Sequence, residues 1–201
     1  MRAINEKIEN DTTTKATIFR AAAKLFAEKG YNGVSMREIS EQSSVTKPTI
    51  YYYFGNKEGI YKALIQEALA YHTEDLKQIS LLNIPVKQKL VELMKRRFQV
   101  SLRHPEWTKF VLEVFNHYDN LPCLNGFKNE VESHGKIFTR MIQDGINSGE
   151  FGASAKPELV VQVMGGVLMH FLMEQLNKHE RILSDQLAED IVELLFKGLN
   201  E

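Results

Sequence analysis

The 201-residue chain has few of the residues that build disulfide scaffolds, metal sites or membrane anchors. Its single cysteine, Cys123, excludes an intramolecular disulfide and most structural zinc patterns, which suits a reducing cytoplasm. No N-terminal signal peptide is recognisable. The longest apolar stretch, Val160 to Met173, is interrupted by Gln162 and His170 and is too short to span a bilayer, so we expect a buried helix there. We therefore expect a cytoplasmic protein without membrane association.

Patterns for catalysis or metal binding are also missing. None of the six histidines forms a HisGluxxHis pattern, a pair at i and i+4 or a pair with the lone cysteine. The sequence has no glycine-rich phosphate loop and no nucleophile elbow. We predict no metal, no cofactor and no catalytic residues, and keep an enzyme as an alternative only because a fold does not fix a function.

The net charge of −1 is unevenly distributed along the chain. Residues 1–62 carry ten Lys or Arg and seven Asp or Glu, a balance of +3, whereas the remaining residues carry 15 and 19, a balance of −4. A mildly basic first part is consistent with nucleic-acid binding at that end.

Residues 35–58, SMREISEQSSVTKPTIYYYFGNKE, predict two short helices separated by a tight turn. Ser35 and Glu38 have the spacing of a capping box, and the serines at 43 and 44 end the first helix. Thr46 can cap the second helix, whose first turn tolerates Pro48 because no backbone N–H is needed there. The spacing is typical of a helix-turn-helix.

The second helix combines an apolar stripe, Ile50 and Phe54, with a basic, hydroxyl-rich and tyrosine-rich remainder. Lys and Thr suit phosphate oxygens and base edges, and tyrosine offers an apolar ring with a hydroxyl group. Asn56 can cap a third helix that opens with Lys57, which makes a phosphate site plausible. Without further information, a protein-binding face is as good an interpretation as DNA binding.

The run TIYYYFGNKE at 49–58, together with MREIS at 36–40 and AAAKLFAEKGY at 21–31, resembles the TetR family of bacterial transcription regulators. The resemblance covers about the first 60 residues; beyond them only helical character and length agree. The chain departs from the family in its turn, where Ser44 and Pro48 stand at places that often hold glycine. The resemblance implies a homodimer that binds a palindromic operator on double-stranded DNA and responds to a small-molecule effector.

The resemblance also assigns roles to residues of the helix-turn-helix. It places Lys47, Pro48, Thr49, Tyr51 and Tyr52 at the major groove, and Tyr53 and Lys57 at phosphates. Thr46 belongs to the same set, and Thr17 and Arg37, near the starts of their helices, are further phosphate candidates. We expect an all-α fold of about nine helices, with a DNA-binding domain at 1–60 and an effector-binding and dimerisation domain at 61–201.

Apolar periodicity and proline positions predict the remaining helices. A first helix ends at Gly30, and a connector helix runs from Lys57 to about Leu76. The later helices are expected at about 86–103, 106–118, 123–147, 156–179 and 184–199.

The last two helices carry more apolar surface than one core can cover. We therefore predict a four-helix dimer interface in which Gly165 and Gly166 allow close approach; the alternative is that both stripes close the monomer core. The interface candidates are Val163, Val167, Phe171, Leu187, Ile191, Leu194 and Leu195.

Aromatic, methionine and histidine residues in the middle of the chain are candidates for an effector pocket, although ordinary packing is the commoner role of such residues. Arg97 is interpreted as a surface arginine whose stem packs on apolar neighbours. The pocket candidates are Trp107, Phe110, Phe115, Tyr118, His134, Phe138, Met141, Met164, Met169, His170 and Met173.

The function expected from these features is a homodimeric repressor that an effector releases from its operator. The alternative is a DNA-binding regulator without an effector, which acts through a protein partner or as an architectural factor.

Overall fold

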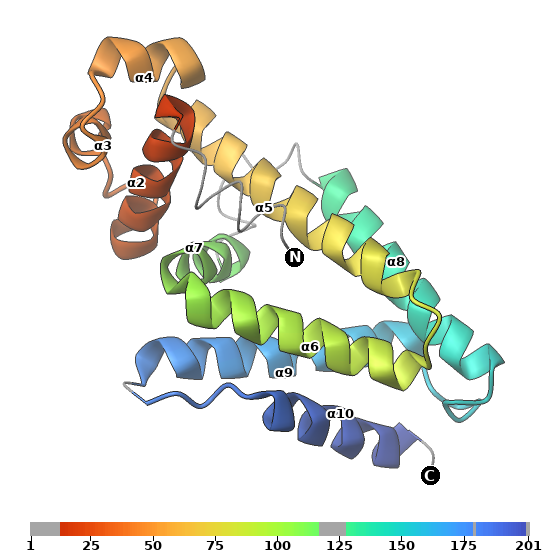
Figure 1. Cartoon of the computed structure of the whole chain (residues 1–201). Coiled ribbons are helices and arrows are strands. Elements are labelled where there is room, and N and C mark those ends of the chain that lie inside the picture. Colours follow the sequence, from red (N-terminus) through yellow and green to blue (C-terminus); the bar gives the residue numbers. More distant parts are fainter. Residues whose placement is uncertain (1–12, 117–127, 179, 200–201) are drawn as a thin grey trace. The chain divides into compact units, whose positions relative to one another are not determined.

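The computed structural model describes residues 13–116, 128–178 and 180–199. The described residues form nine helices and no strand, which confirms the all-α class. In chain order these helices are α2 (Thr14–Lys29), α3 (Met36–Ser43), α4 (Lys47–Phe54), α5 (Lys57–Ser80), α6 (Val86–Arg103), α7 (Pro105–Asn116), α8 (Lys128–Asn147), α9 (Pro157–Asn177) and α10 (Asp185–Leu199) (Figure 1).

The helices divide into two compact units. Of the described residues, the first unit contains 13–71, 106–116 and Lys128, and the second contains His72–Pro105, 129–178 and 180–199. Helix α5 is continuous through the division, and α7 packs with the N-terminal helices although it follows α6 in sequence. The boundary between these packing units therefore differs from the domain boundary expected after residue 60. The division into a DNA-binding domain and an effector-binding domain remains a proposal.

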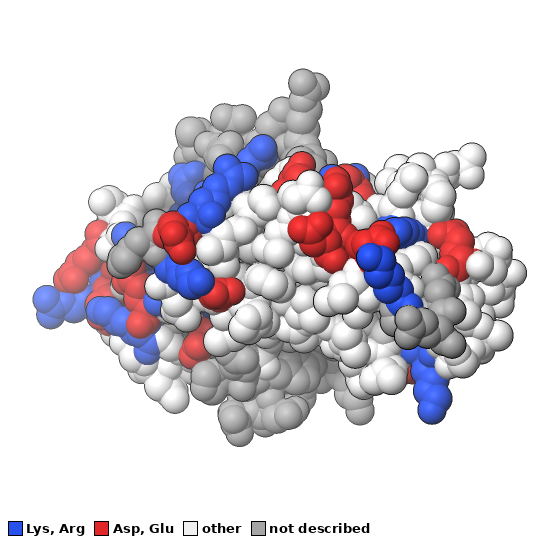
Figure 2. All heavy atoms as spheres, turned by 90° about the horizontal axis from the view of Figure 1, so that it is seen from below, with Lys and Arg blue, Asp and Glu red and all other residues white. Residues whose placement is uncertain are grey.

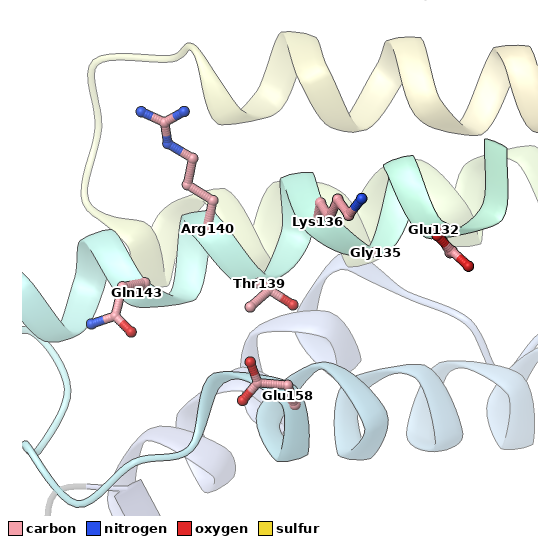
Figure 3. Close-up of a pocket in the computed structure, with 7 residues that line it drawn as sticks. All are labelled: Glu132, Gly135, Lys136, Thr139, Arg140, Gln143 and Glu158. Atoms are coloured by element: carbon pink, nitrogen blue, oxygen red, sulfur yellow. The ribbon is translucent and has the colours of Figure 1, made fainter. Parts of the chain in front are cut away.

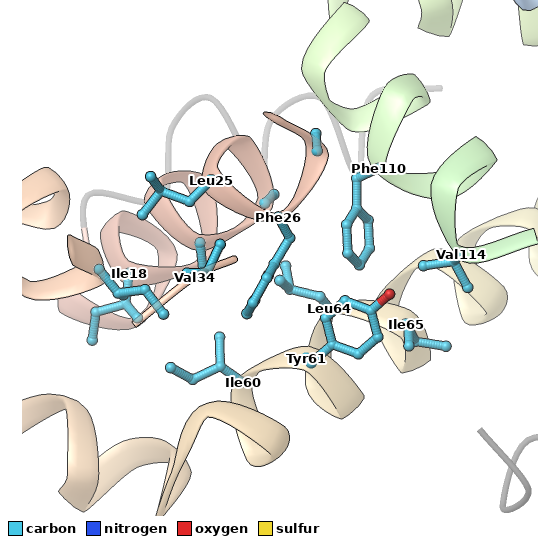
Figure 4. Close-up of a cluster of buried hydrophobic side chains, with 14 of the residues drawn as sticks. Ile18, Leu25, Phe26, Val34, Ile60, Tyr61, Leu64, Ile65, Phe110 and Val114 are labelled. Carbon is cyan, nitrogen blue, oxygen red and sulfur yellow. The ribbon is translucent and has the colours of Figure 1, made fainter. Parts of the chain in front are cut away.

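The first unit is built around Phe26 on α2 (Figure 4). The Phe26 ring meets the edge of Tyr61 on α5 at 4.9 Å between centroids, and Tyr61 meets Phe110 on α7 at 5.5 Å. Aromatic rings favour such edge-to-face contacts, which add to the free energy gained by burying them. This core fixes the helices that carry the helix-turn-helix.

The second unit pairs α6 with α10. Lys87 and Lys95 on α6 form ion pairs with Glu193 and Glu189 on α10. Apolar residues on α6 recur at helical spacing and are buried: Leu90, Leu93, Met94 and Phe98.

Helix α9 is the most apolar of the described helices, yet little of it is covered. By length and composition it could cross a membrane, yet only 17% of its most apolar window is buried. The expectation of a buried helix is therefore not met within one protomer, because the described residues cover only one side of α9, at Val160, Met164 and Leu172.

Candidate nucleic-acid interface and effector region

The helix-turn-helix begins and ends where local signals predict. The Ser35 and Glu38 side chains each bond the other's backbone N–H, at 3.2 and 2.8 Å, which forms the predicted capping box. Ser44 ends α3 in the left-handed region with φ of 54°. Ser40 Oγ then donates to the Val45 carbonyl at 2.7 Å, which holds the turn against α3. The entry of α4 is therefore set by side-chain hydrogen bonds.

Helix α4 starts after Thr46, with Pro48 in its first turn as predicted. The Thr46 side chain does not cap the helix; its hydroxyl pairs with that of Thr49 at 2.9 Å. Lys47 and Pro48 are exposed, and Thr49 is partly exposed. Only the conformation at Thr46, and not its side chain, therefore serves as the cap.

The tyrosines form the outer surface of α4. Tyr51, Tyr52 and Tyr53 are 47%, 85% and 44% exposed, and the Tyr52 and Tyr53 rings meet edge to face at 5.4 Å. Ile50 is fully buried, and Phe54 stacks on Phe19 of α2 at 5.1 Å. The helix is thus anchored by two residues and presents the others outward.

The two weaker phosphate candidates, Arg37 and Thr17, each bond to a residue four positions away in the sequence. Arg37 pairs with Glu41 at 2.7 Å on the exposed side of α3. The Thr17 hydroxyl donates to the Thr13 carbonyl at 3.2 Å. Exposed i,i+4 pairs are weak, so Arg37 remains able to exchange Glu41 for a phosphate.

Lys57 is directed into the protein and not outward. Its Nζ donates to the carbonyls of Tyr31 and Val34, both at 2.9 Å, and lies 4.4 Å from the centre of the Tyr31 ring. Asn56 caps α5 as predicted, accepting from the Gly59 N–H at 2.8 Å. This geometry does not favour the phosphate contact predicted for Lys57, because the ammonium group is engaged by carbonyls distant in sequence.

The second unit contains a buried ionic cluster. Asp75 on α5 accepts from Arg96 at 2.8 Å and from Arg97 at 2.9 Å, and Arg97 also donates to the His72 carbonyl at 3.3 Å. Arg97 is only 7% exposed, so its interpretation as a surface arginine is wrong. Its partner lies 22 positions earlier in the chain, where helical periodicity gives no signal of it.

Two imidazoles lie in the field of Arg97. Burial, and then the Arg97 charge, lower the pKa of His134 on α8 to about 4. Burial is also the main cause that lowers the pKa of His72 well below its usual value, followed by Arg97 and His134. Ser101, one turn beyond Arg97, has a buried hydroxyl with no hydrogen-bond partner among the described residues. These groups form the buried polar region of the second unit.

The predicted pocket residues do not gather in one unit. Trp107 and Phe110 pack into the core of the first unit, and Phe115 is exposed on α7. Tyr118 lies outside the described residues. In the second unit His170 and Met173 are exposed on α9, and Met169 is partly exposed. The buried candidates of that unit are Phe138 and Met141 on α8 and Met164 on α9. His134, also on α8, is partly buried.

An open groove of about 650 Å³ lies between α8 and the start of α9 (Figure 3). Thr139 lies on the side of α8 that faces Glu158, whereas Arg140 points away from it. Its lining is polar and of mixed charge: Glu132, Gly135, Lys136, Thr139, Arg140, Gln143 and Glu158. No aromatic or aliphatic residue lines this groove, whereas such residues line most of a typical effector pocket.

Most of the predicted interface residues remain accessible in the protomer. Val163 and Leu194 are exposed, and Val167, Phe171, Leu187 and Leu195 are partly exposed. Ile191 is the exception, because α10 turns it into the protomer core at 8% exposure. Figure 2 shows the side on which α10 lies in Figure 1, with uncharged residues in white among the charged ones.

Comparison with known proteins agrees with this geometry. Residues 18–64, which include the helix-turn-helix and most of the core of the first unit, match the model of the bacterial regulatory proteins of the tetR family. The fatty acid metabolism regulator protein of Bacillus subtilis is 24% identical over 91% of this chain and 94% of its own length.

Two solved structures show the same fold. The transcriptional regulator FadR from Bacillus subtilis, in complex with stearoyl-CoA, superposes with a TM-score of 0.78 at 23% identity, covering 90% of this chain and 97% of that one. AibR, in complex with isovaleryl coenzyme A and operator DNA, gives a TM-score of 0.75 at 20% identity, covering 92% and 98%.

The fold and the exposed recognition helix define a helix-turn-helix transcription regulator. Over residues 18–64 the chain belongs to the TetR family of bacterial regulatory proteins.

Proposed function

We propose that this protein is a homodimeric repressor that binds a palindromic operator and is released from it by an acyl-coenzyme A. The observation that carries the proposal is α4, which two apolar residues anchor while Lys47, Pro48 and three tyrosines face outward. A helix that presents such side chains from a rigid core can enter the major groove and contact base edges and phosphates. Catalysis is not part of the proposal, and a regulator of this kind works in the bacterial cytoplasm, where its DNA is.

The proposed dimer interface is the uncovered face of α9 together with α10. Leu159, Val163 and Leu194 leave large apolar side chains exposed, which is unfavourable in water. At Gly165 and Gly166 an added Cβ would meet no described atom within 4 Å, so a second copy can approach the helix closely there. Packing against a second copy also explains why α9 carries a long apolar surface, so no membrane is needed to cover it.

The acyl-coenzyme A effector is proposed from two proteins of similar fold, which were solved in complex with stearoyl-CoA and with isovaleryl coenzyme A. The second unit offers buried apolar residues on α8 and α9 for an acyl chain, and Arg97, His134 and Ser101 for polar groups. An effector need only prefer the dimer geometry that does not fit the operator. A hundredfold preference corresponds to about 2.7 kcal/mol, enough to release most of the bound protein.

The effector proposal is tested by fluorescence anisotropy of labelled operator with the full-length protein. Stearoyl-CoA and isovaleryl-CoA are titrated separately, with free coenzyme A and stearate as matched controls. We expect one acyl-coenzyme A to lower operator affinity about a hundredfold and the controls to leave it unchanged. If neither thioester changes the affinity, the effector assignment fails, and a regulator that responds to a protein partner takes its place.

A further inference from the structure

Lys57 joins two turns that are distant in sequence. It is the first residue of α5, directly after the α4–α5 turn, and its ammonium group reaches the carbonyls of Tyr31 and Val34 in the α2–α3 turn. The two carbonyls and the face of the Tyr31 ring lie around the same ammonium group. Because charged donors make stronger hydrogen bonds than neutral ones, this contact is a firm link within the first unit.

The orientation of α4 depends on such links because the helix itself is short. Its eight residues bury one side chain fully, Ile50, and stack a second, Phe54. At its C-terminal end, Gly55 has φ of 74°, and an added Cβ on Gly59 would lie 1.9 Å from the Phe54 carbonyl. The α4–α5 turn is therefore tight, so a displacement of Lys57 at the start of α5 is transmitted to α4.

We infer that Lys57 is a positioning residue for the recognition helix, acting through the Tyr31 and Val34 carbonyls and not through a DNA phosphate. This inference rests on the proposed sequence-specific DNA binding. A phosphate contact contributes equally to all DNA sequences, whereas a residue that orients α4 contributes chiefly where side chains must meet particular base edges. The two roles therefore predict different losses on operator and on random DNA.

The test compares Lys57→Met with Lys47→Met in the full-length protein. Each variant removes one positive charge, and Lys47 is the exposed residue at the start of α4. Binding to an operator selected from random duplexes, and to a random duplex of the same length, is measured over a range of potassium chloride concentrations. Thermal unfolding of each variant sets a measuring temperature at which all of them are folded.

For Lys57→Met we expect operator affinity to fall about tenfold or more, random-duplex affinity to fall less than about twofold, and the salt slope to stay at the wild-type value. For Lys47→Met the slope should fall by about 0.9 per protomer if that lysine neutralises a phosphate. Equal losses on both duplexes for Lys57→Met, with a slope reduced by about 0.9 per protomer, would overturn the inference.

Lys57→Gln supplies a second criterion, because it keeps a hydrogen-bond donor and loses the charge. A positioning role predicts that Lys57→Gln recovers part of the operator affinity lost in Lys57→Met, whereas a phosphate contact predicts equal losses in both. Wild-type protein that selects no sequence would refute the proposed function itself. Wild-type specificity together with a reduced slope in Lys57→Met refutes only the role of Lys57.

Discussion

Acidification should destabilise the second unit through His134. Its pKa in the folded protein is about 4, because burial and the neighbouring Arg97 disfavour the charged imidazole. In an unfolded chain a histidine has a pKa of about 6.5. Below that value the unfolded state binds a proton that the folded state does not, so stability present above pH 6.5 is lost as the pH falls toward 4.

The magnitude follows from these two pKa values. Protonation of the unfolded chain costs the folded state about 2 kcal/mol at pH 5 and about 3 kcal/mol near pH 4. The pKa of His72 is also lowered, mainly by burial, so it adds a loss of the same sign. Wild-type protein should therefore lose at least about 2 kcal/mol between pH 7.5 and pH 5 from these imidazoles.

The assay is urea unfolding at fixed protein concentration at pH 7.5, 6 and 5. His134→Gln should lower the pH-dependent loss by about 2 kcal/mol, because the titrating group is gone. A His134→Gln protein that keeps the whole wild-type loss would refute the reasoning.

Three further substitutions test other parts of the structure. Leu194→Arg, at a side chain that is 74% exposed, should place a charge in the proposed interface and give a folded monomer in sedimentation, with weak operator binding in anisotropy. A variant that stays fully dimeric would favour the alternative that the apolar stripes belong to the monomer core. Asp75→Ala should lower the free energy of unfolding by about 3–5 kcal/mol because Arg97 is left buried without its carboxylate, and a loss below about 1 kcal/mol would contradict that pairing. Ser35→Ala removes the capping box and should lower the free energy of unfolding in urea by about 1 kcal/mol. An unchanged free energy of unfolding would show that the cap does not stabilise the protein.

Local signals in the sequence predicted the helix boundaries well. The helix expected at 86–103 has those bounds, because Pro85 and Pro105 delimit it. Ser35, Ser44 and Asn56 mark ends that depend on the residue itself and its nearest neighbours, so pattern alone finds them. The connector helix, α5, runs to Ser80, past its expected end near Leu76, because no proline or glycine stops it there.

Contacts between distant segments could not be predicted in this way. The carbonyls that hold Lys57 lie 23 and 26 positions before it, and the carboxylate that pairs with Arg97 lies 22 before it. Helical periodicity shows which side of a helix is apolar and gives no information about which helix covers it. For the same reason Phe110 was a pocket candidate in the sequence and is a core residue of the first unit in the structure.

The most direct test of the account is selection of bound fragments from randomised duplex DNA by the purified full-length protein, with stringency set by increasing salt. A sequence-specific dimer should select a palindromic site with half-sites about one helical turn apart, roughly 34–36 Å, and this binding should survive physiological salt. Recovery of unrelated sequences whose binding disappears as salt rises would contradict a sequence-specific dimeric regulator.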